Sequence, residues 1–550
     1  MSLLLPKSGR VELARAFYSN IVNPTASNNA GTEFGGPGHY FHFSLGKTSP
    51  WPDDEAPPAP VDSETFTKDF RKSIMFTQLI TSSNVCHLAN RVDKDWVSGR
   101  TYDPYDDDYS ASRPAASGAT SLADANFYVI TDENKVYKCL DNRDLDGNVT
   151  TVSDKPTSTD TAIFSTNDNY FWKFLFQVSS ADETAFLDVE HIPVRKLTGN
   201  PTHDVNGELD SVTVTAGGSG YTSVPEVLIS GDGIGGSATA VLTGDAVTSV
   251  TINTAGSGYT FALITFSGGG GSGAAATFVL GDADALPALQ SAVENTAVKG
   301  TVDKINLSNS GQGYTVGDVT VTITGDGSGA AASATIAADT GAITGITVTN
   351  RGSGYSFANI TFTQSVGSGT GAIARAILSP INGHGSNPVK ELFASTIGIV
   401  ASVSENSNKD LIIGNDFRQI GLIKNLYNYT NSAIWTSNTA TASFIIDVDN
   451  NAQYAVDDNI TTDDGGQFTV VQLADDGLGT FQIHLQPIIG LITATSTLEN
   501  TTKSLTGLSI NSVINPEISV TSGDIMYIEN RSPISRSADQ VETIKALINF

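Results

Sequence analysis

The motif Gly-x-Gly-Tyr occurs four times in the middle of this chain and constrains its fold more than any other feature. The motif tyrosines are Tyr221, Tyr259, Tyr314 and Tyr355. The second copy closely matches the fourth, and the first and third share a Gly-Asp-Gly turn, so the order is ABAB. We therefore expect a duplicated unit of two repeats, because internal self-similarity is typical of repeat architectures. Residues 281–300, which are helix-prone, are the expected joint.

Each repeat has a simple physical interpretation. Alternating β-branched residues such as Val212 and Val214 predict a strand with one buried face. The two glycines permit a turn at positive φ, and the tyrosine after them is expected to cap a small core with its hydroxyl in water. A Gly/Ala tract such as 269–276 allows neighbouring backbones to approach closely. A phosphate-binding loop is disfavoured, because no Gly-x-x-x-x-Gly-Lys-Ser/Thr occurs.

Composition narrows the class of protein. The chain has 550 residues, with 30 Lys and Arg against 58 Asp and Glu and a formal net charge of −28. Because the phosphate backbone repels so acidic a chain, we expect no nucleic-acid partner. Hydrophobic residues make up 39% and charged residues only 16%. The expected fold is mainly β and multidomain, with a β-sandwich-type core, few short helices and the repeats as an inserted β region.

Periodicity predicts the elements outside the repeats. Helical spacing covers 10–21 and begins again at Phe66, while the proline-rich stretch 50–60 is an expected extended loop. Strands are expected at Phe41–Leu45, Phe127–Leu140, Tyr170–Val178, Ser443–Val448, Thr480–Gln486, Ile525–Glu529 and Ile544–Phe550. For the last of these, Ile544–Phe550, a helix is the second-ranked alternative.

The sequence offers no mark of export. Two cysteines, Cys86 and Cys139, cannot crosslink a chain of this length, so we expect free thiols. The three apolar residues before Pro6 are too few for a signal peptide. No apolar run approaches the roughly 18 residues of a membrane span. We therefore expect synthesis in a cytosol and no membrane span.

No enzyme signature stands above background. The seven histidines have no compact metal-ligand spacing, and Cys-x-x-Cys is absent. Asn142–Gly147 resembles the first half of a calcium loop, but Ser153 stands where the bidentate acid belongs. The acidic run Asp103–Asp108 is expected to be a solvated loop. We expect no catalytic residue, no cofactor and no bound metal.

The C-terminal segment carries a specific family resemblance. Residues 523–534 read Gly-Asp-Ile-Met-Tyr-Ile-Glu-Asn-Arg-Ser-Pro-Ile, and Asp539-Gln540 follows. This resembles the end of the baseplate wedge subunit of T-even-like contractile-tailed phages, which reads close to Met-Ile-Tyr-Met-Glu-Asn-Arg-Pro-Pro-Ile and then Asp-Gln. The length resembles that of the marine cyanophage versions. Six further landmarks follow the family's order: Phe17-Tyr18, Phe43–Trp51, Asp103–Tyr105, Val136–Asp141, Tyr170–Phe176 and Phe417–Ile420.

The resemblance implies a structural protein and not an enzyme. Members of the family are largely β and dimerise. They sit in each wedge of the tail baseplate, between the central wedge subunits and peripheral fibre or pin proteins, and have no catalytic residues and no cofactor. The implied location is the virion, after synthesis in the host cytoplasm.

The resemblance also predicts how the chain is divided. The family core covers 1–200, continues over 380–429 and ends with the C-terminal motif at 523–550. The remaining stretches are the repeat pairs 201–280 and 301–379, their joint 281–300, and a β-rich insertion at 430–522.

Candidate interface residues lie in two of the family motifs. They are Arg418, Tyr527, Glu529, Asn530, Arg531 and Pro533. On a strand, Tyr527, Glu529 and Arg531 share one face, and Asn530 lies on the other. Glu529 and Arg531 either pair with each other or reach a partner chain. Arg418 either anchors an interface or forms an internal salt bridge.

Two other functions stay open from sequence. The first is a virion adhesion or glycan-binding protein, with the four-tyrosine repeats as its binding surface. The second and weaker one is a tail-associated polysaccharide depolymerase, because carboxylates are abundant but sequence cannot place two of them face to face.

Overall fold

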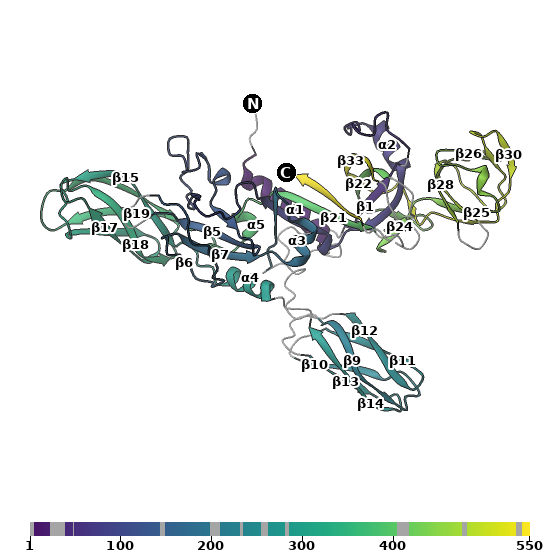
Figure 1. Cartoon of the computed structure of the whole chain (residues 1–550), viewed down its shortest axis with the longest axis horizontal. Coiled ribbons are helices and arrows are strands. Elements are labelled where there is room, and N and C mark those ends of the chain that lie inside the picture. The colour runs from purple at the N-terminus through teal and green to yellow at the C-terminus, as the bar shows by residue number, and fades with distance from the viewer. Residues whose placement is uncertain are drawn as a thin grey trace. The chain divides into compact units, whose positions relative to one another are not determined.

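The computed structural model of the chain is mainly β, with 47% of residues in strands and 12% in helices (Figure 1). The expected fold class is therefore confirmed. The structure describes residues 5–22, 39–47, 49–143, 149–197, 209–231, 235–254, 262–280, 285–403, 417–475, 481–534 and 542–550.

The chain forms two compact units. The first comprises Met1–Ala14, His87–Thr396 and Phe550, and the second comprises Arg15–Cys86 and Ile397–Asn549. Region 1–200 is thus shared between the units. Because each unit combines segments that are remote in sequence, its core forms only when these segments meet.

A four-stranded antiparallel sheet, in the order β4-β5-β7-β6, lies at the centre of the first unit. Its strands are β4 (Tyr128–Ile130), β5 (Lys135–Asp141), β6 (Phe164–Ser165) and β7 (Phe171–Gln177). Both faces are covered, because Val136 and Leu140 join one apolar cluster while Tyr137 and Trp172 join another. The aromatic strand expected at Tyr170–Val178 is therefore buried, and Phe127–Leu140 forms the β4–β5 hairpin.

Short elements accompany this sheet. β3 (Val85–Asn90) pairs with β8 (His191–Val194). Helix α3 (Ser180–Phe186) begins after Ser179, whose hydroxyl accepts the N–H of Asp182, and α5 (Pro388–Glu391) begins after Asn387 in the same way. The helix expected at 10–21 is α1 (Lys7–Val22).

The repeats form two modules with the same pairing scheme. Each has six strands, and its first strand pairs with its last, its second with its fifth, and its third with its fourth. This agreement is what a duplicated two-repeat unit predicts, and α4 (Ala285–Asn295) lies in the expected joint. The first module contains β9 (Leu209–Ser219), β10 (Glu226–Gly231), β11 (Ser237–Thr243), β12 (Ala246–Thr254), β13 (Ala262–Ser267) and β14 (Ser272–Leu280). The second contains β15 (Val302–Gln312), β16 (Val319–Gly325), β17 (Ser328–Ile336), β18 (Ile343–Ser353), β19 (Ala358–Gln364) and β20 (Thr370–Leu378).

The second unit contains a five-stranded sheet in the order β24-β2-β1-β22-β33. Its strands are β1 (Phe41–Gly46), β2 (Ile74–Leu79), β22 (Phe417–Lys424), β24 (Thr439–Thr441) and β33 (Asp524–Ile534). Helix α2 (Glu64–Ser73) packs on this sheet through Phe70, whose ring occupies the space that a side chain at Gly421 would need.

The β-rich stretch 430–522 supplies a seven-stranded sheet with its own apolar core, which includes Phe444, Phe468 and Leu485. Its strands are β25 (Phe444–Val448), β26 (Asn459–Thr462), β27 (Gln467–Asp475), β28 (Phe481–Ile489), β29 (Leu498–Asn500), β30 (Leu505–Leu508) and β31 (Ser512–Ile514). Two further pairs are β23 (Tyr427–Asn428) with β32 (Ile518–Ser519), and β21 (Thr396–Val403) with β34 (Glu542–Asn549). The C-terminal segment is thus a strand, and its helical alternative is wrong.

The structure bears on the expectations about the cysteines and about membrane-spanning helices. Cys86 and Cys139 are both free and buried, as expected. Among the described residues, no helix combines the length and the apolar character that crossing a membrane requires.

Candidate functional site

The C-terminal motif forms β33, which lies at the edge of the five-stranded sheet and pairs with β22. Most of its side chains are half-buried, and Met526 is 45% exposed. A pocket of about 520 Å³ lies beside its first half and is lined by Val61, Phe66 and Arg71 together with residues 524–528. This strand therefore presents both a sheet edge and a partly apolar hollow.

Three motif residues form a hydrogen-bonded row on one face of β33, as the alternation predicted. The hydroxyl of Tyr527 donates to Oε2 of Glu529 at 2.6 Å, and Nε of Arg531 donates to Oε1 of Glu529 at 2.6 Å. Burial, and then the bond to Glu529, raises the pKa of Tyr527, so its hydroxyl stays a donor. Arg531 also donates from Nη2 to the carbonyl of Lys545 at 2.7 Å. Glu529 and Arg531 therefore pair with each other within one chain.

The proline-rich loop 50–60 is attached to the same strand. Asn530 donates from Nδ2 to the carbonyl of Pro58 at 2.8 Å, and the indole of Trp51 donates to the carbonyl of Arg531 at 2.9 Å. Pro533 also lies in β33, where its missing N–H fits an edge strand. These contacts fix the strand while its outer edge stays unpaired in the described part of the sheet.

Arg418 lies on β22, next to the motif strand. Its Nε and Nη2 donate to the two carboxylate oxygens of Asp54 at 2.9 and 3.0 Å, and its side chain is only 6% exposed. These hydrogen bonds lower the pKa of Asp54. Of the two alternatives for Arg418, the geometry favours the internal salt bridge.

The repeat tyrosines cap the module cores, as expected. Tyr221, Tyr314 and Tyr355 are buried, whereas Tyr259 lies outside the described residues. Each ring lies against a glycine of another segment, where an added Cβ would come within about 2.5 Å of the ring. These glycines are Gly271 for Tyr221, Gly369 for Tyr314 and Gly327 for Tyr355.

The hydroxyls of two repeat tyrosines, which were expected to lie in water, are only partly buried and also contact the backbone. The Tyr314 hydroxyl accepts the backbone N–H of Ala372, and the Tyr355 hydroxyl accepts that of Ala330, each at 3.4 Å. The tyrosine therefore connects the motif turn to a neighbouring strand as well as closing the core.

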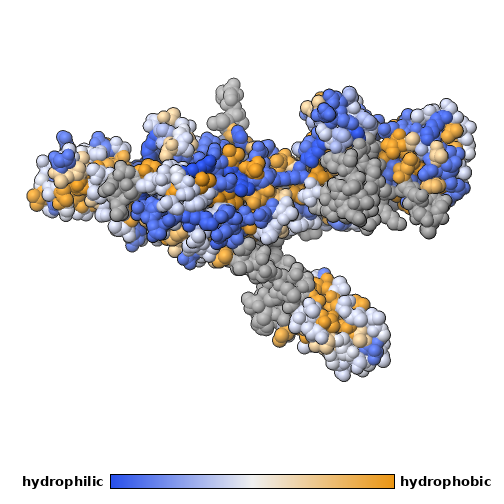
Figure 2. Space-filling view, in the orientation of Figure 1, coloured by the Kyte–Doolittle hydropathy of each residue, from blue (hydrophilic) through white to orange (hydrophobic). Residues whose placement is uncertain are grey.

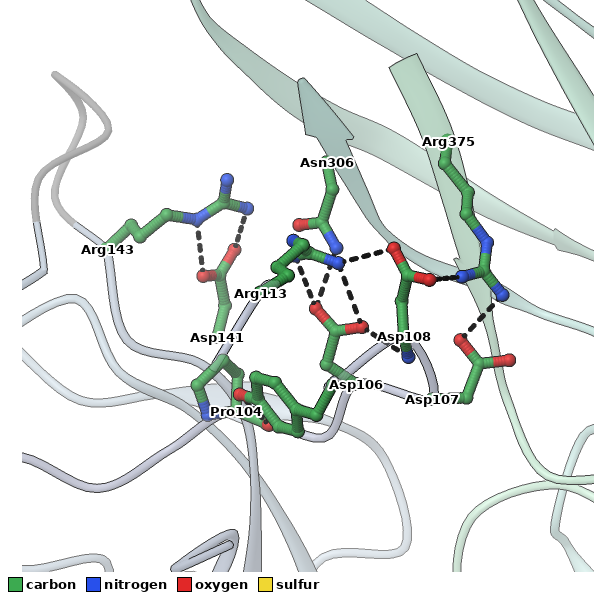
Figure 3. A network of polar contacts seen from close by, with 10 residues as sticks. Pro104, Asp106, Asp107, Asp108, Arg113, Asp141, Arg143, Asn306 and Arg375 are labelled. Carbon is green, nitrogen blue, oxygen red and sulfur yellow. Dashed lines mark hydrogen bonds and ion pairs between the residues drawn. The ribbon is translucent and has the colours of Figure 1, made fainter. Parts of the chain in front are cut away.

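The acidic run 103–108 is not the solvated loop that its composition suggested (Figure 3). Asp103 and Asp106 are buried. Asp103 accepts the backbone N–H groups of Ser117 and Asn126 at 2.9 and 2.7 Å. Burial of a carboxylate is tolerated where hydrogen bonds replace its hydration, which composition alone cannot reveal.

The same run contacts the second repeat module. Asp106 accepts from Nη2 of Arg113 at 2.8 Å and from Nδ2 of Asn306 at 2.7 Å. Asp108 pairs with Arg375, which also reaches Asp107 at 3.3 Å (Figure 3). The loop therefore joins the central sheet of the first unit to strands β15 and β20.

Sequence reasoning missed a buried ion pair between Lys138 and Glu391, whose Nζ and Oε2 are 2.6 Å apart. The available signal was a lysine within the apolar strand Val136–Leu140. In the described residues, no group of three or more His, Cys, Asp or Glu is placed to hold a metal ion. Part of the half calcium loop, 144–148, lies outside them.

Comparisons of the chain with models of protein families and with curated proteins found no match. A function is therefore proposed from the collinear motifs and from the geometry of β33.

Proposed function

We propose that the protein is a structural subunit of a phage tail baseplate wedge and acts by binding neighbouring subunits, without catalysis. The collinear motifs that resemble the T-even-like wedge family support this role. The observation that carries it is that the most specific motif forms an edge strand with a hollow beside it. Such an edge offers free backbone groups to another chain. The proposed partners are other wedge proteins and peripheral fibre or pin proteins.

A second copy of the chain is the proposed partner of β33 itself. An edge strand can pair with the same strand of a copy related by a twofold axis, and the two contacts are then identical. The exposed Met526 and the pocket lined by Phe66 and Val61 supply apolar surface for that contact. This geometry supports the proposed homodimer.

The first repeat module supplies a further contact surface. Leu228, Val241 and Leu263 are exposed on its strands, and Figure 2 shows apolar residues gathered over this module. Exposed apolar patches of this kind mark binding surfaces. We assign this surface to a neighbouring tail protein.

The Met526→Lys variant should remain folded and lose the homodimer. A charge on an exposed edge strand opposes pairing with another strand, so the dimer dissociation constant should rise at least about tenfold. Light scattering after size exclusion would measure this against the 57.5 kDa of one chain. Leu491→Lys is the matched control, because Leu491 is apolar and 59% exposed but lies outside the strands. A dimer that Met526→Lys leaves intact would refute the β33 contact.

The wedge role is tested separately on whole particles. Chemical cross-linking and mass spectrometry of purified virions should link this chain to itself and to other wedge proteins. If the chain is missing from intact particles, the wedge proposal fails, and adhesion through the repeats becomes the leading prediction.

A further inference from the structure

A second pocket lies in the first unit, between its central sheet and the second repeat module. It has a volume of about 190 Å³. One wall comes from the ends of β5, β6 and β7, and the other from β15 and β18. No motif of the sequence analysis pointed to it.

The charged side chains that line the pocket sum to +1, whereas the whole chain has a net charge of −28. Its lining contains three basic side chains, Arg143, Lys304 and Arg351, and two acidic ones, Asp141 and Asp303. A cationic hollow in so acidic a protein selects for anions, because the rest of the surface repels them.

Both acidic residues of the pocket are already engaged. Asp141 accepts two hydrogen bonds from Arg143, each at 2.9 Å. Asp303 accepts from Arg351 at 3.2 Å and from Nε2 of His384 at 2.5 Å. Burial lowers the pKa of His384, and the charge of Asp303 opposes that shift.

Lys304 is the third basic residue of the pocket lining, and neither Asp141 nor Asp303 forms an ion pair with it. It is only 6% exposed, and the described residues provide no hydrogen bond or ion pair to its ammonium. Its nitrogen is not completely buried, and the charges that attract it are those of Asp141 and Asp106 at longer range. A largely desolvated ammonium without an ion pair is costly, so a fold keeps one chiefly where something else pairs with it. Its position in the wall of the pocket indicates that the missing partner is a ligand.

We propose that this pocket binds a small organic anion of the sugar-acid or sugar-phosphate class, whose carboxylate or phosphate pairs with Lys304. The inference does not depend on the wedge role. A space of about 190 Å³ holds about six waters at about 30 Å³ each, which suits one sugar and not a polymer. Ser165, Asn169 and Thr347 line it with groups that hydrogen-bond hydroxyls, and Phe171 and Ile346 add apolar surface for a carbon skeleton.

Binding should weaken as the pH rises through about 8. Burial lowers the pKa of Lys304 to about 8; the positive charges of Arg143 and Arg113 lower it further, and Asp141 and Asp106 oppose them. Lys304 therefore loses its proton just above neutral pH, while a carboxylate or phosphate stays ionised. An anion in contact with the ammonium raises that pKa, so ligand and proton bind together.

Calorimetric titration of the full chain with glucuronate, a hexose phosphate, glucose and inorganic phosphate tests the proposal. We expect one or both sugar anions to bind at pH 7 and glucose not to bind, and the better of the two identifies the anionic group. Lys304→Met should weaken binding at least about tenfold. Because this change removes a buried unpaired charge, the variant should melt no lower than the wild type without ligand.

Lys299→Met is the matched control, since Lys299 is an exposed lysine just before β15. This variant should bind the sugar anions with the same affinity as the wild type. The proposal is overturned if neither sugar anion binds at about 10 mM, if glucose binds equally well, or if Lys304→Met binds as tightly as the wild type. Binding of inorganic phosphate alone would overturn the sugar class.

Discussion

The Lys138→Met variant should be less stable than the wild-type chain by about 3–5 kcal/mol, the usual cost of removing one partner of a buried ion pair. Lys138 is 0% and Glu391 4% exposed. The ammonium of Lys138 also lies 4.5 Å from the centre of the Tyr105 ring. Methionine keeps the length of the side chain but leaves the carboxylate of Glu391 without its counter-charge.

The pH dependence of this variant follows from Glu391. In the wild type, burial raises the pKa of Glu391, but the charge of Lys138 opposes it and the net pKa is lowered. The pair therefore stabilises the fold at neutral pH, and this contribution is lost as the pH falls through that lowered pKa. Without Lys138, burial still raises the pKa of the carboxyl and the backbone N–H of Gly385 still lowers it, so its folded-state pKa should lie higher than in the wild type. The deficit of the variant should then shrink in acid.

Local hydrogen exchange is the appropriate measurement, because a chain of two units need not unfold in one step. Peptides from β5 and β7 should lose protection in Lys138→Met. Lys135→Met is the control on the same strand, since Lys135 pairs with the half-exposed Glu133, and it should cost at most about 1 kcal/mol. Adding Glu391→Gln to Lys138→Met should recover part of the loss. If the single variant matches its control, the ion pair contributes nothing to stability.

The local sequence pattern predicted the helices and strands of this protein, but it could not predict which of them contact one another. A lysine in the apolar strand Val136–Leu140 indicates a buried charge. Its partner Glu391 could not be predicted, because it lies 253 residues away in a one-turn helix. Lys304 follows the same rule, because its burial depends on the packing of β15 against another sheet. The alternation in the C-terminal motif correctly predicted the row from Tyr527 to Arg531. That β33 lies at a sheet edge is a property of topology, and Pro533, whose missing N–H fits an edge strand, was a local signal consistent with it.

The repeats were the most predictable part of the chain, since their structure is set by short-range chemistry. Positive φ at both motif glycines follows from the turn, and the three described copies have it. The prediction for the acidic run 103–108 was wrong for the opposite reason. Its composition is that of a solvated loop, and only the later strands β15 and β20 bring Asn306 and Arg375 to it.

The Gly352→Ala variant should destabilise the second repeat module by about 3 kcal/mol. Gly352 is the first glycine of its motif and has φ +61°, where an L-residue costs about 1–2 kcal/mol. A Cβ there would also lie 2.5 Å from the amide nitrogen of Ala330 and from the carbonyl oxygen of Ser328. Both atoms belong to the backbone of β17, so they cannot rotate away, and overpacking adds about 1–3 kcal/mol. Strands β17 and β18 should exchange their amide hydrogens faster.

Gly317→Ala separates these two costs. Gly317 lies in the same module with φ +78°, but a Cβ there would meet nothing within 4 Å. It therefore carries the conformational cost alone, about 1–2 kcal/mol. If both variants lose the same protection, the close approach of β17 to the motif turn contributes nothing. If Gly352→Ala loses more, the motif glycine is required for strand contact as well as for the turn. Gly218 and Gly311, whose added Cβ atoms would meet backbone at 2.5 and 2.6 Å, should then behave in the same way.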